Sequence, residues 1–203
     1  MGLLNDIEHF ERLSAEKQEF LIAYLVAIAS LLSVVDSWLP KPLPLAKIGL
    51  ANIVTLTLVL YGRYRISLLV AFFRVLVSHV LGGTLFTFGF WLSLFGSFFS
   101  ALVMSGVHRM AGRWLSVYGI SLWGGWAHCL AQGVLAGIFL GFNKGVILYV
   151  AFLMIIGIGT SLVLGWIVDR YLDTKSQINK NHDYEKCNTS HNPEEKTTSL
   201  GEG

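Results

Sequence analysis

Arg74 is the residue of this sequence whose chemistry most needs an explanation, because it lies within a long apolar run. Between Asp36 and Asp169 the chain has no aspartate or glutamate, although the same stretch carries eight lysines and arginines. A buried cation without a partner is costly and usually marks a ligand site or a pathway. Two interpretations stay open. Arg74 grips the anionic group of a ligand with its planar guanidinium, or it is neutralised by Asp36, main-chain carbonyls and water.

His128 and Gln132 form a second polar group. They are four residues apart, so on a helix they share one face. They lie in the stretch WGGWAHCLAQGVLAG, whose glycines would let neighbouring helices approach closely. The pair could line a pocket, or His128 could be a packing histidine that is hydrogen-bonded across a helix pair.

The composition indicates the kind of molecule that must position these groups. Of 203 residues, 54% are hydrophobic and only 14% are charged, which is typical of polytopic membrane proteins. Six apolar segments are candidates for membrane-spanning helices, of which the second is short: residues 20–39, 48–61, 66–81, 85–107, 119–140 and 146–168. The sequence therefore predicts an all-α protein in three parts: a cytosolic amphipathic segment (1–18), a six-helix membrane domain (19–170) and a disordered polar cytosolic tail (171–203).

Arginines are concentrated in the loops after the second, fourth and sixth segments. Because such loops stay on the cytoplasmic side, both termini are expected in the cytoplasm and the protein in the cell inner (cytoplasmic) membrane, as a multi-pass protein. Lys47 departs from this rule, since it lies where a proline-rich outer loop enters the second segment.

With this topology, the depth of each polar residue follows from its position along its segment. Arg74 and His128 fall near the middle of the membrane, whereas Asn52, His79 and Gln132 fall towards its outer side. We therefore expect a pocket that opens to the outside.

Four stretches of the chain resemble a known family: LPLAKIGLANIVTLTLVLYG, AFFRVLVSHVLGG, WLSLFGSFFSALVMS and WGGWAHCLAQGVLAGIFL. Together they resemble the Gx transporter family, whose members are often labelled heptaprenyl diphosphate synthase component I. That family is similar to the substrate-binding S components of energy-coupling factor vitamin transporters. The likeness covers about residues 20–170.

The resemblance implies an S-component-like bundle and roles for particular residues. The family's recurring polar positions correspond to Lys47, Gly49, Asn52, Arg74, His128 and Gln132. Ala23 and Ala27 resemble the small-residue face by which S components contact a transmembrane coupling subunit. Cys129 departs from the pattern, because the family usually has asparagine after the histidine, and this bears on the polar lining of that segment.

The synthase label can be compared with the residues present. Prenyl chain elongation needs clustered carboxylates that hold magnesium against diphosphate, and the apolar core of this sequence has no paired aspartates. We therefore expect no enzyme activity, no catalytic residues, and neither a metal nor another cofactor. The sequence also lacks the G-x-x-x-x-G-K-[ST] loop that binds nucleotides, so energy for transport would have to come from separate ATPases.

These observations favour a substrate-binding membrane subunit of an uptake transporter for a small anionic solute. Its expected partners are the solute, the lipid bilayer, a coupling subunit and ATPases, but no nucleic acid. The alternative is a non-catalytic membrane subunit or accessory protein of isoprenoid or heptaprenyl diphosphate metabolism, and a third reading is a self-sufficient channel or carrier. The substrate-binding residues are predicted to be Lys47, Asn52, Arg74, His79, His128 and Gln132.

Overall fold

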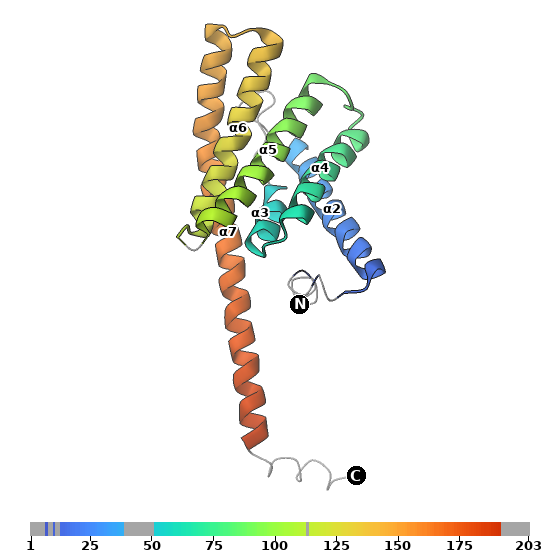
Figure 1. Cartoon of the computed structure of the whole chain (residues 1–203), viewed down its shortest axis with the longest axis vertical. Coiled ribbons are helices and arrows are strands. Elements are labelled where there is room, and N and C mark those ends of the chain that lie inside the picture. The colour runs from blue at the N-terminus through green and yellow to red at the C-terminus, as the bar shows by residue number, and fades with distance from the viewer. Residues whose placement is uncertain (1–6, 8–9, 11–12, 39–50, 113, 192–203) are drawn as a thin grey trace. The chain divides into compact units, whose positions relative to one another are not determined.

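The computed structural model describes residues 7, 10, 13–38, 51–112 and 114–191, and these form helices joined by short turns (Figure 1). The helices are α2 (Ala15–Trp38), α3 (Asn52–Leu60), α4 (Tyr64–Leu81), α5 (Phe88–Ala111), α6 (Val117–Leu140) and α7 (Lys144–His191). The described part contains no strand, so the all-α class and the six helices predicted from the sequence are confirmed. The chain divides into two compact units, residues 1–168 and 169–203. Helix α7 continues past residue 170, where the sequence predicts that the membrane domain ends.

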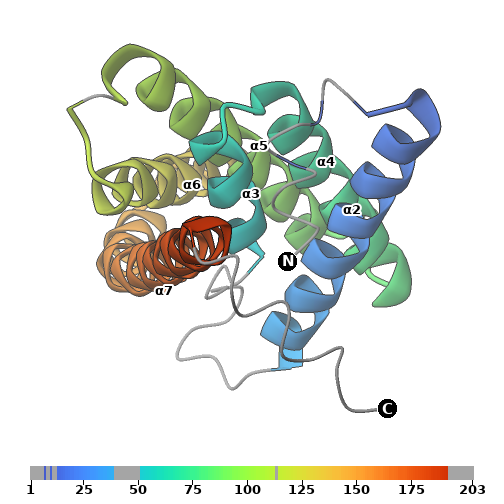
Figure 2. The same ribbon diagram turned by 90° about the horizontal axis from the view of Figure 1, so that it is seen from below.

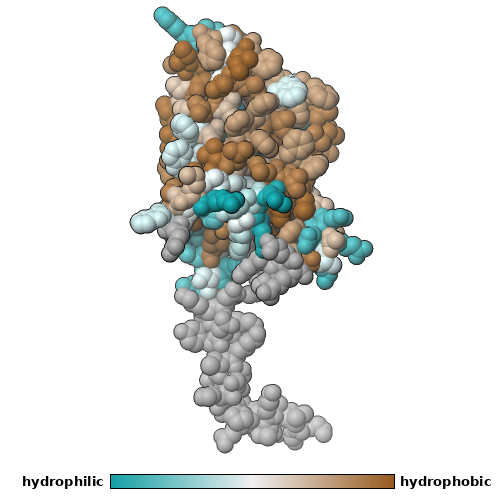
Figure 3. All heavy atoms as spheres, in the orientation of Figure 1, coloured by the Kyte–Doolittle hydropathy of each residue, from teal (hydrophilic) through white to brown (hydrophobic). Residues whose placement is uncertain are grey.

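Four of the described helices are long and apolar enough to cross a membrane: α2, α4, α5 and α7. Helix α3, with 9 residues, is too short to do so. Helix α6 has 24 residues and no charged side chain, but His128, Gln132 and its glycines lower its mean hydropathy. Hydrophobic side chains cover most of the visible face of the first unit, and hydrophilic ones gather near its lower end (Figure 3). Large hydrophobic side chains such as Phe72, Phe99 and Trp123 are well exposed. This is the surface of a membrane protein, because soluble proteins rarely expose such wide apolar areas.

Helix α3 is central in the bundle, and it contacts α2, α4, α5 and α6 (Figure 2). It is followed at once by α4 through the turn at Gly62, whose φ of 72° lies in the region that glycine adopts most readily. Consequently α3 runs antiparallel to α4. The first residue of α3, Asn52, therefore lies beside the middle of α4 rather than beside its beginning.

The turn between α4 and α5 covers residues 82–87. Gly83 and Phe86 both have a φ of 62° there, which is rare for a bulky residue such as Phe86. Thr87 caps α5, because its side-chain oxygen accepts a hydrogen bond from the backbone N–H of Phe90 at 3.3 Å. Gly82 and Gly83 both lie in this turn, and Gly89 lies in the first turn of α5.

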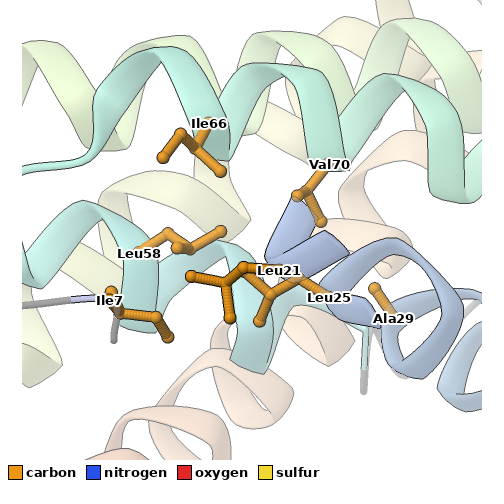
Figure 4. Close-up of a cluster of buried hydrophobic side chains, with 7 residues drawn as sticks. All are labelled: Ile7, Leu21, Leu25, Ala29, Leu58, Ile66 and Val70. Atoms are coloured by element: carbon orange, nitrogen blue, oxygen red, sulfur yellow. The ribbon is translucent and has the colours of Figure 1, made fainter. Parts of the chain in front are cut away.

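One apolar cluster joins α2, α3 and α4 (Figure 4). Helix α2 contributes Leu21, Leu25 and Ala29, which are spaced by four residues and so form one stripe. The other members are Ile7, Leu58, Ile66 and Val70.

Ile7 shows that residues before α2 pack against the bundle. Its side chain is only 2% exposed. Its carbonyl accepts a hydrogen bond from Nε of Arg63 at 3.1 Å, and the guanidinium of Arg63 lies 5.9 Å from the centre of the Phe10 ring. These contacts hold the N-terminal segment against the end of the bundle where α4 begins.

Helix α6 packs between α5 and the first part of α7 by means of small residues. A Cβ atom on Gly124 would lie 2.6 Å from the side chain of Met104 on α5. On the other side, the hydroxyl of Ser121 donates to the carbonyl of Ser161 on α7 at 2.7 Å. The glycines around His128 thus allow close helix approach, as the sequence predicts.

Candidate functional site

Arg74 connects three helices at the centre of the bundle. Its side chain is 4% exposed. From α4, its Nη2 donates to Oδ1 of Asn52 on α3 at 2.7 Å and to Oγ of Ser97 on α5 at 3.0 Å. We call Asn52, Arg74 and Ser97 the Arg74 cluster.

The charge of Arg74 is incompletely satisfied by the cluster itself. Both partners of Nη2 are neutral groups, and Nε has no hydrogen-bond partner among the residues that the structure describes. Asp36, which is buried on α2, attracts the guanidinium electrostatically. Asp36 thus offsets part of the charge of Arg74, while Nε is a donor without an acceptor in the described part of the chain. The role of Arg74 in holding a ligand stays a prediction.

His128 and Gln132 share one face of α6, as their spacing predicts, and the structure turns that face towards α5. A Cβ atom on Gly96 would lie 2.8 Å from Cε1 of His128 and 3.0 Å from Cγ of Gln132. Gln132 is buried, and its Nε2 donates to the carbonyl of Leu92 at 3.5 Å, which is long for a hydrogen bond. Because Gly96 precedes Ser97, the α6 pair and the Arg74 cluster meet at the same turn of α5.

His79 is placed at the turn between α4 and α5. Its Nδ1 is 2.7 Å from Oγ1 of Thr84, and its ring meets the ring of Phe90 edge-on, with centroids 5.4 Å apart. These contacts give His79 a part in closing the turn. Its predicted role in substrate binding stays a prediction.

The other residues named from the sequence have varied locations. Lys47 and Gly49 lie outside the described residues. Ala23 and Ala27 are exposed on α2, on the side away from Leu21 and Leu25. The small-residue face of α2 is thus not used for packing within the described bundle.

Cys129 points away from the Arg74 cluster. Its Sγ lies 3.5 Å from the carbonyl of Leu153 on α7, and a Cβ atom on Gly157 of α7 would be 2.6 Å from this sulfur. The departure from the family pattern at Cys129 therefore falls on the α7 side of α6, whereas His128 falls on the α5 side.

Sequence reasoning did not single out Gly96 and Ser97. They lie in WLSLFGSFFSALVMS, which reads as a glycine- and serine-rich packing span. A signal was present, because small residues recur on one helix face at the buried positions Ser93, Gly96, Ser97 and Ser100.

Comparison with known proteins supplies a family. The model of the family described as heptaprenyl diphosphate synthase component I matches residues 25–171. No curated protein and no solved structure matches the chain. Since the match spans well over half of the sequence and includes α3 to α6, the chain belongs to the heptaprenyl diphosphate synthase component I family.

Proposed function

We propose that this protein is the substrate-binding membrane subunit of an uptake transporter, and that it binds a small anionic solute at Arg74. The observation that carries the proposal is the partly satisfied guanidinium in the middle of the bundle. An arginine at such a place is expensive to keep, and its usual reason is a ligand or a pathway. A carboxylate or phosphate would supply the acceptor that Nε lacks.

The neighbouring groups suit the polar end of such a solute. Asn52 and Ser97 fix one edge of the guanidinium, so little side-chain entropy remains to be lost on binding. Across Gly96, His128 and Gln132 add side chains that can donate or accept hydrogen bonds. A charge-assisted hydrogen bond from Nε of Arg74 would then orient the solute.

The surface of α2 supports a role as one subunit of a larger assembly. Ala23 and Ala27 are exposed and spaced by four residues, which allows another helix to approach closely. Since the sequence has no nucleotide-binding loop, a coupling subunit docked on this face, together with ATPases, would provide the energy.

A second candidate function is a non-catalytic membrane subunit in heptaprenyl diphosphate metabolism. The name of the family favours it. An apolar groove of about 310 Å³ between α5 and α6, lined by Phe95, Phe99, Trp126 and Leu130 among others, would suit a prenyl chain. Catalysis by this chain is not part of either proposal, because the apolar core has no paired carboxylates for magnesium.

Native mass spectrometry of the protein, gently solubilised from its own membranes, tests the two candidates. We expect the wild type to carry one small anionic solute that is absent from Arg74→Gln and retained in Ser121→Ala, a matched loss of a buried polar group elsewhere. Arg74→Lys, which keeps the charge, serves as a second variant and should retain the solute weakly. A wild type that carries no solute but stays attached to an enzyme of prenyl metabolism would favour the second candidate.

A further inference from the structure

We propose that the seam between α4 and α5 holds a file of internal water molecules, which leads from Arg74 to the end of the bundle where α4 begins. The seam is defined here as Ser67, Arg74, Ser97, Ser100 and Ser105. This inference goes beyond the proposed function, because it concerns water and does not depend on any solute.

Two hydrogen bonds fix how the helices are aligned. Nη2 of Arg74 donates to Oγ of Ser97 at 3.0 Å, and the hydroxyl of Tyr64 lies 2.9 Å from Nδ1 of His108. Helices α4 and α5 are antiparallel neighbours, so residue numbers rise along α4 as they fall along α5 (Figure 1).

This alignment places the serines of the seam at defined levels. Ser67 follows Tyr64 by three residues and Ser105 precedes His108 by three, so Ser67 and Ser105 share a level. Ser100 follows Ser97 by three residues, so along the helix axis it lies between the level of Arg74 and the level shared by Ser67 and Ser105. Along the helix axis, Ser100 lies roughly 4.5 Å from Ser97 and Ser105 lies roughly 7.5 Å from Ser100, at about 1.5 Å per residue. One water molecule bridges the first gap with hydrogen bonds at both ends, and two water molecules in series bridge the second.

The hydroxyls at these levels lack partners. Ser67 and Ser100 are 0% exposed and Ser105 is 9% exposed, yet none of their hydroxyls has a hydrogen-bond partner in the described part of the chain. The hydroxyl of Thr55, on the adjacent helix α3, is in the same condition. One turn separates Thr55 from Asn52, so it lies near the level of Ser100.

Hydroxyls elsewhere in the bundle behave differently. Ser30 and Thr57 donate to the carbonyls of Val26 and Ile53 in their own helices, at 2.7 and 2.8 Å. Ser121 donates to a carbonyl of α7. The unpartnered hydroxyls are therefore a property of this region and not of serine in these helices.

Ordered water is the usual partner of buried polar groups that the protein leaves unsatisfied. Each level of the seam offers hydroxyls that can donate and accept, and Nε of Arg74 offers a donor at one end. At the other end, Tyr64 and His108 supply polar groups where the file meets the surface region. The seam would thus hydrate the Arg74 cluster from the side opposite to the turn at residues 82–87.

Exchange of cysteine S–H for S–D in heavy water, followed by infrared spectroscopy, tests the proposal with water itself as the probe. The background is the full chain with Cys129→Ser and Cys187→Ser. Into it go Ser67→Cys and Ser100→Cys, which are close to isosteric. Their matched controls are Leu69→Cys and Leu102→Cys, two residues away on the same helices but on the exposed apolar faces, where the native leucines are 44% and 47% exposed.

In lipid vesicles we expect both seam thiols to exchange at least about tenfold faster than their controls, because exchange requires contact with water. Equal rates within each pair, whether fast or slow, would overturn the proposal. Thr55→Cys provides an independent site on α3 should one of the seam variants fail to fold. The presence or absence of a solute in native mass spectrometry does not affect this result, so failure here and failure of the proposed function can be told apart.

Discussion

Two buried regions that share helix α4 have opposite characters. The apolar cluster around Leu25 joins α2, α3 and α4 through hydrophobic side chains alone (Figure 4). One turn further along α4, the Arg74 cluster joins α3, α4 and α5 through a charged group with an N–H that lacks a partner in the described structure. Val70 and Arg74 are both at most 4% exposed, so burial does not distinguish the regions.

The difference lies in what burial does to each region. In the apolar cluster, removal of the Ile7 side chain from water stabilises the fold. Close packing of the helices within the membrane stabilises it further. Burying a guanidinium costs free energy that two neutral hydrogen bonds and the attraction of Asp36 only partly offset. The apolar cluster therefore serves stability, whereas for the Arg74 cluster we propose a role in holding a ligand.

The largest effect is expected from Leu25→Ala in the apolar cluster. Leu25 is 4% exposed, and its truncation leaves a cavity that should lower the free energy of unfolding by about 2–5 kcal/mol. Solute occupancy of the folded protein should stay unchanged. Unfolding in mixed micelles combined with native mass spectrometry checks both parts. Loss of solute from a folded Leu25→Ala protein would break the distinction between the regions.

Asn52→Asp should leave the stability of the fold intact and weaken solute binding. The carboxylate would replace the amide oxygen that accepts from Nη2 of Arg74 and would satisfy its charge internally. We expect a folded protein that is at least as stable as the wild type, with solute affinity reduced by roughly 1.5–3 kcal/mol, about 10- to 160-fold. Occupancy by native mass spectrometry, with Thr57→Val on the same helix as control, measures this. Undiminished occupancy in Asn52→Asp would mean that the anion is not held by Arg74.

Gly96→Ala tests the meeting point of α5 and α6. The added methyl group would lie 2.8 Å from Cε1 of His128, so the histidine or the helix must shift, at a cost of about 1–3 kcal/mol. Gly106→Ala on the same helix meets nothing within 4 Å and should be neutral or stabilising. Thermal unfolding of the two variants gives the comparison. Equal melting temperatures would show that His128 does not pack on Gly96.

The smallest effect is expected at the turn between α4 and α5. Thr84→Val removes the partner of Nδ1 of His79 and should lower the free energy of unfolding by about 0.5–1.5 kcal/mol. Because this bond closes the turn, solute occupancy should change little. A loss of occupancy comparable with that in Asn52→Asp would extend the site to His79.

How far the sequence predicts this molecule depends on the kind of signal. Long apolar segments give the helices, and the cost of a charge in hydrocarbon singles out Arg74. Pairing of His128 with Gln132 follows from helical spacing. The hydrogen bond from Arg74 to Ser97 was not predicted, because a serine in an apolar span usually indicates close helix packing rather than an acceptor for a buried guanidinium. Ile7 belongs to the predicted amphipathic segment, because Ile7, Phe10 and Leu13 recur every three residues. The spacing predicts an apolar face but not that this face packs against α2, α3 and α4.

The central claim is that Arg74 holds the anionic group of a solute. An experimental structure of the protein, purified from its own membranes without exhaustive washing, tests it most directly. We predict density for a compact anion within hydrogen-bonding distance of Nε of Arg74, with Asn52 and Ser97 still bonded to Nη2. A structure in which Nε donates to Asp36 or to a main-chain carbonyl, with no density beside the guanidinium, would contradict the claim and leave Arg74 as a structural residue.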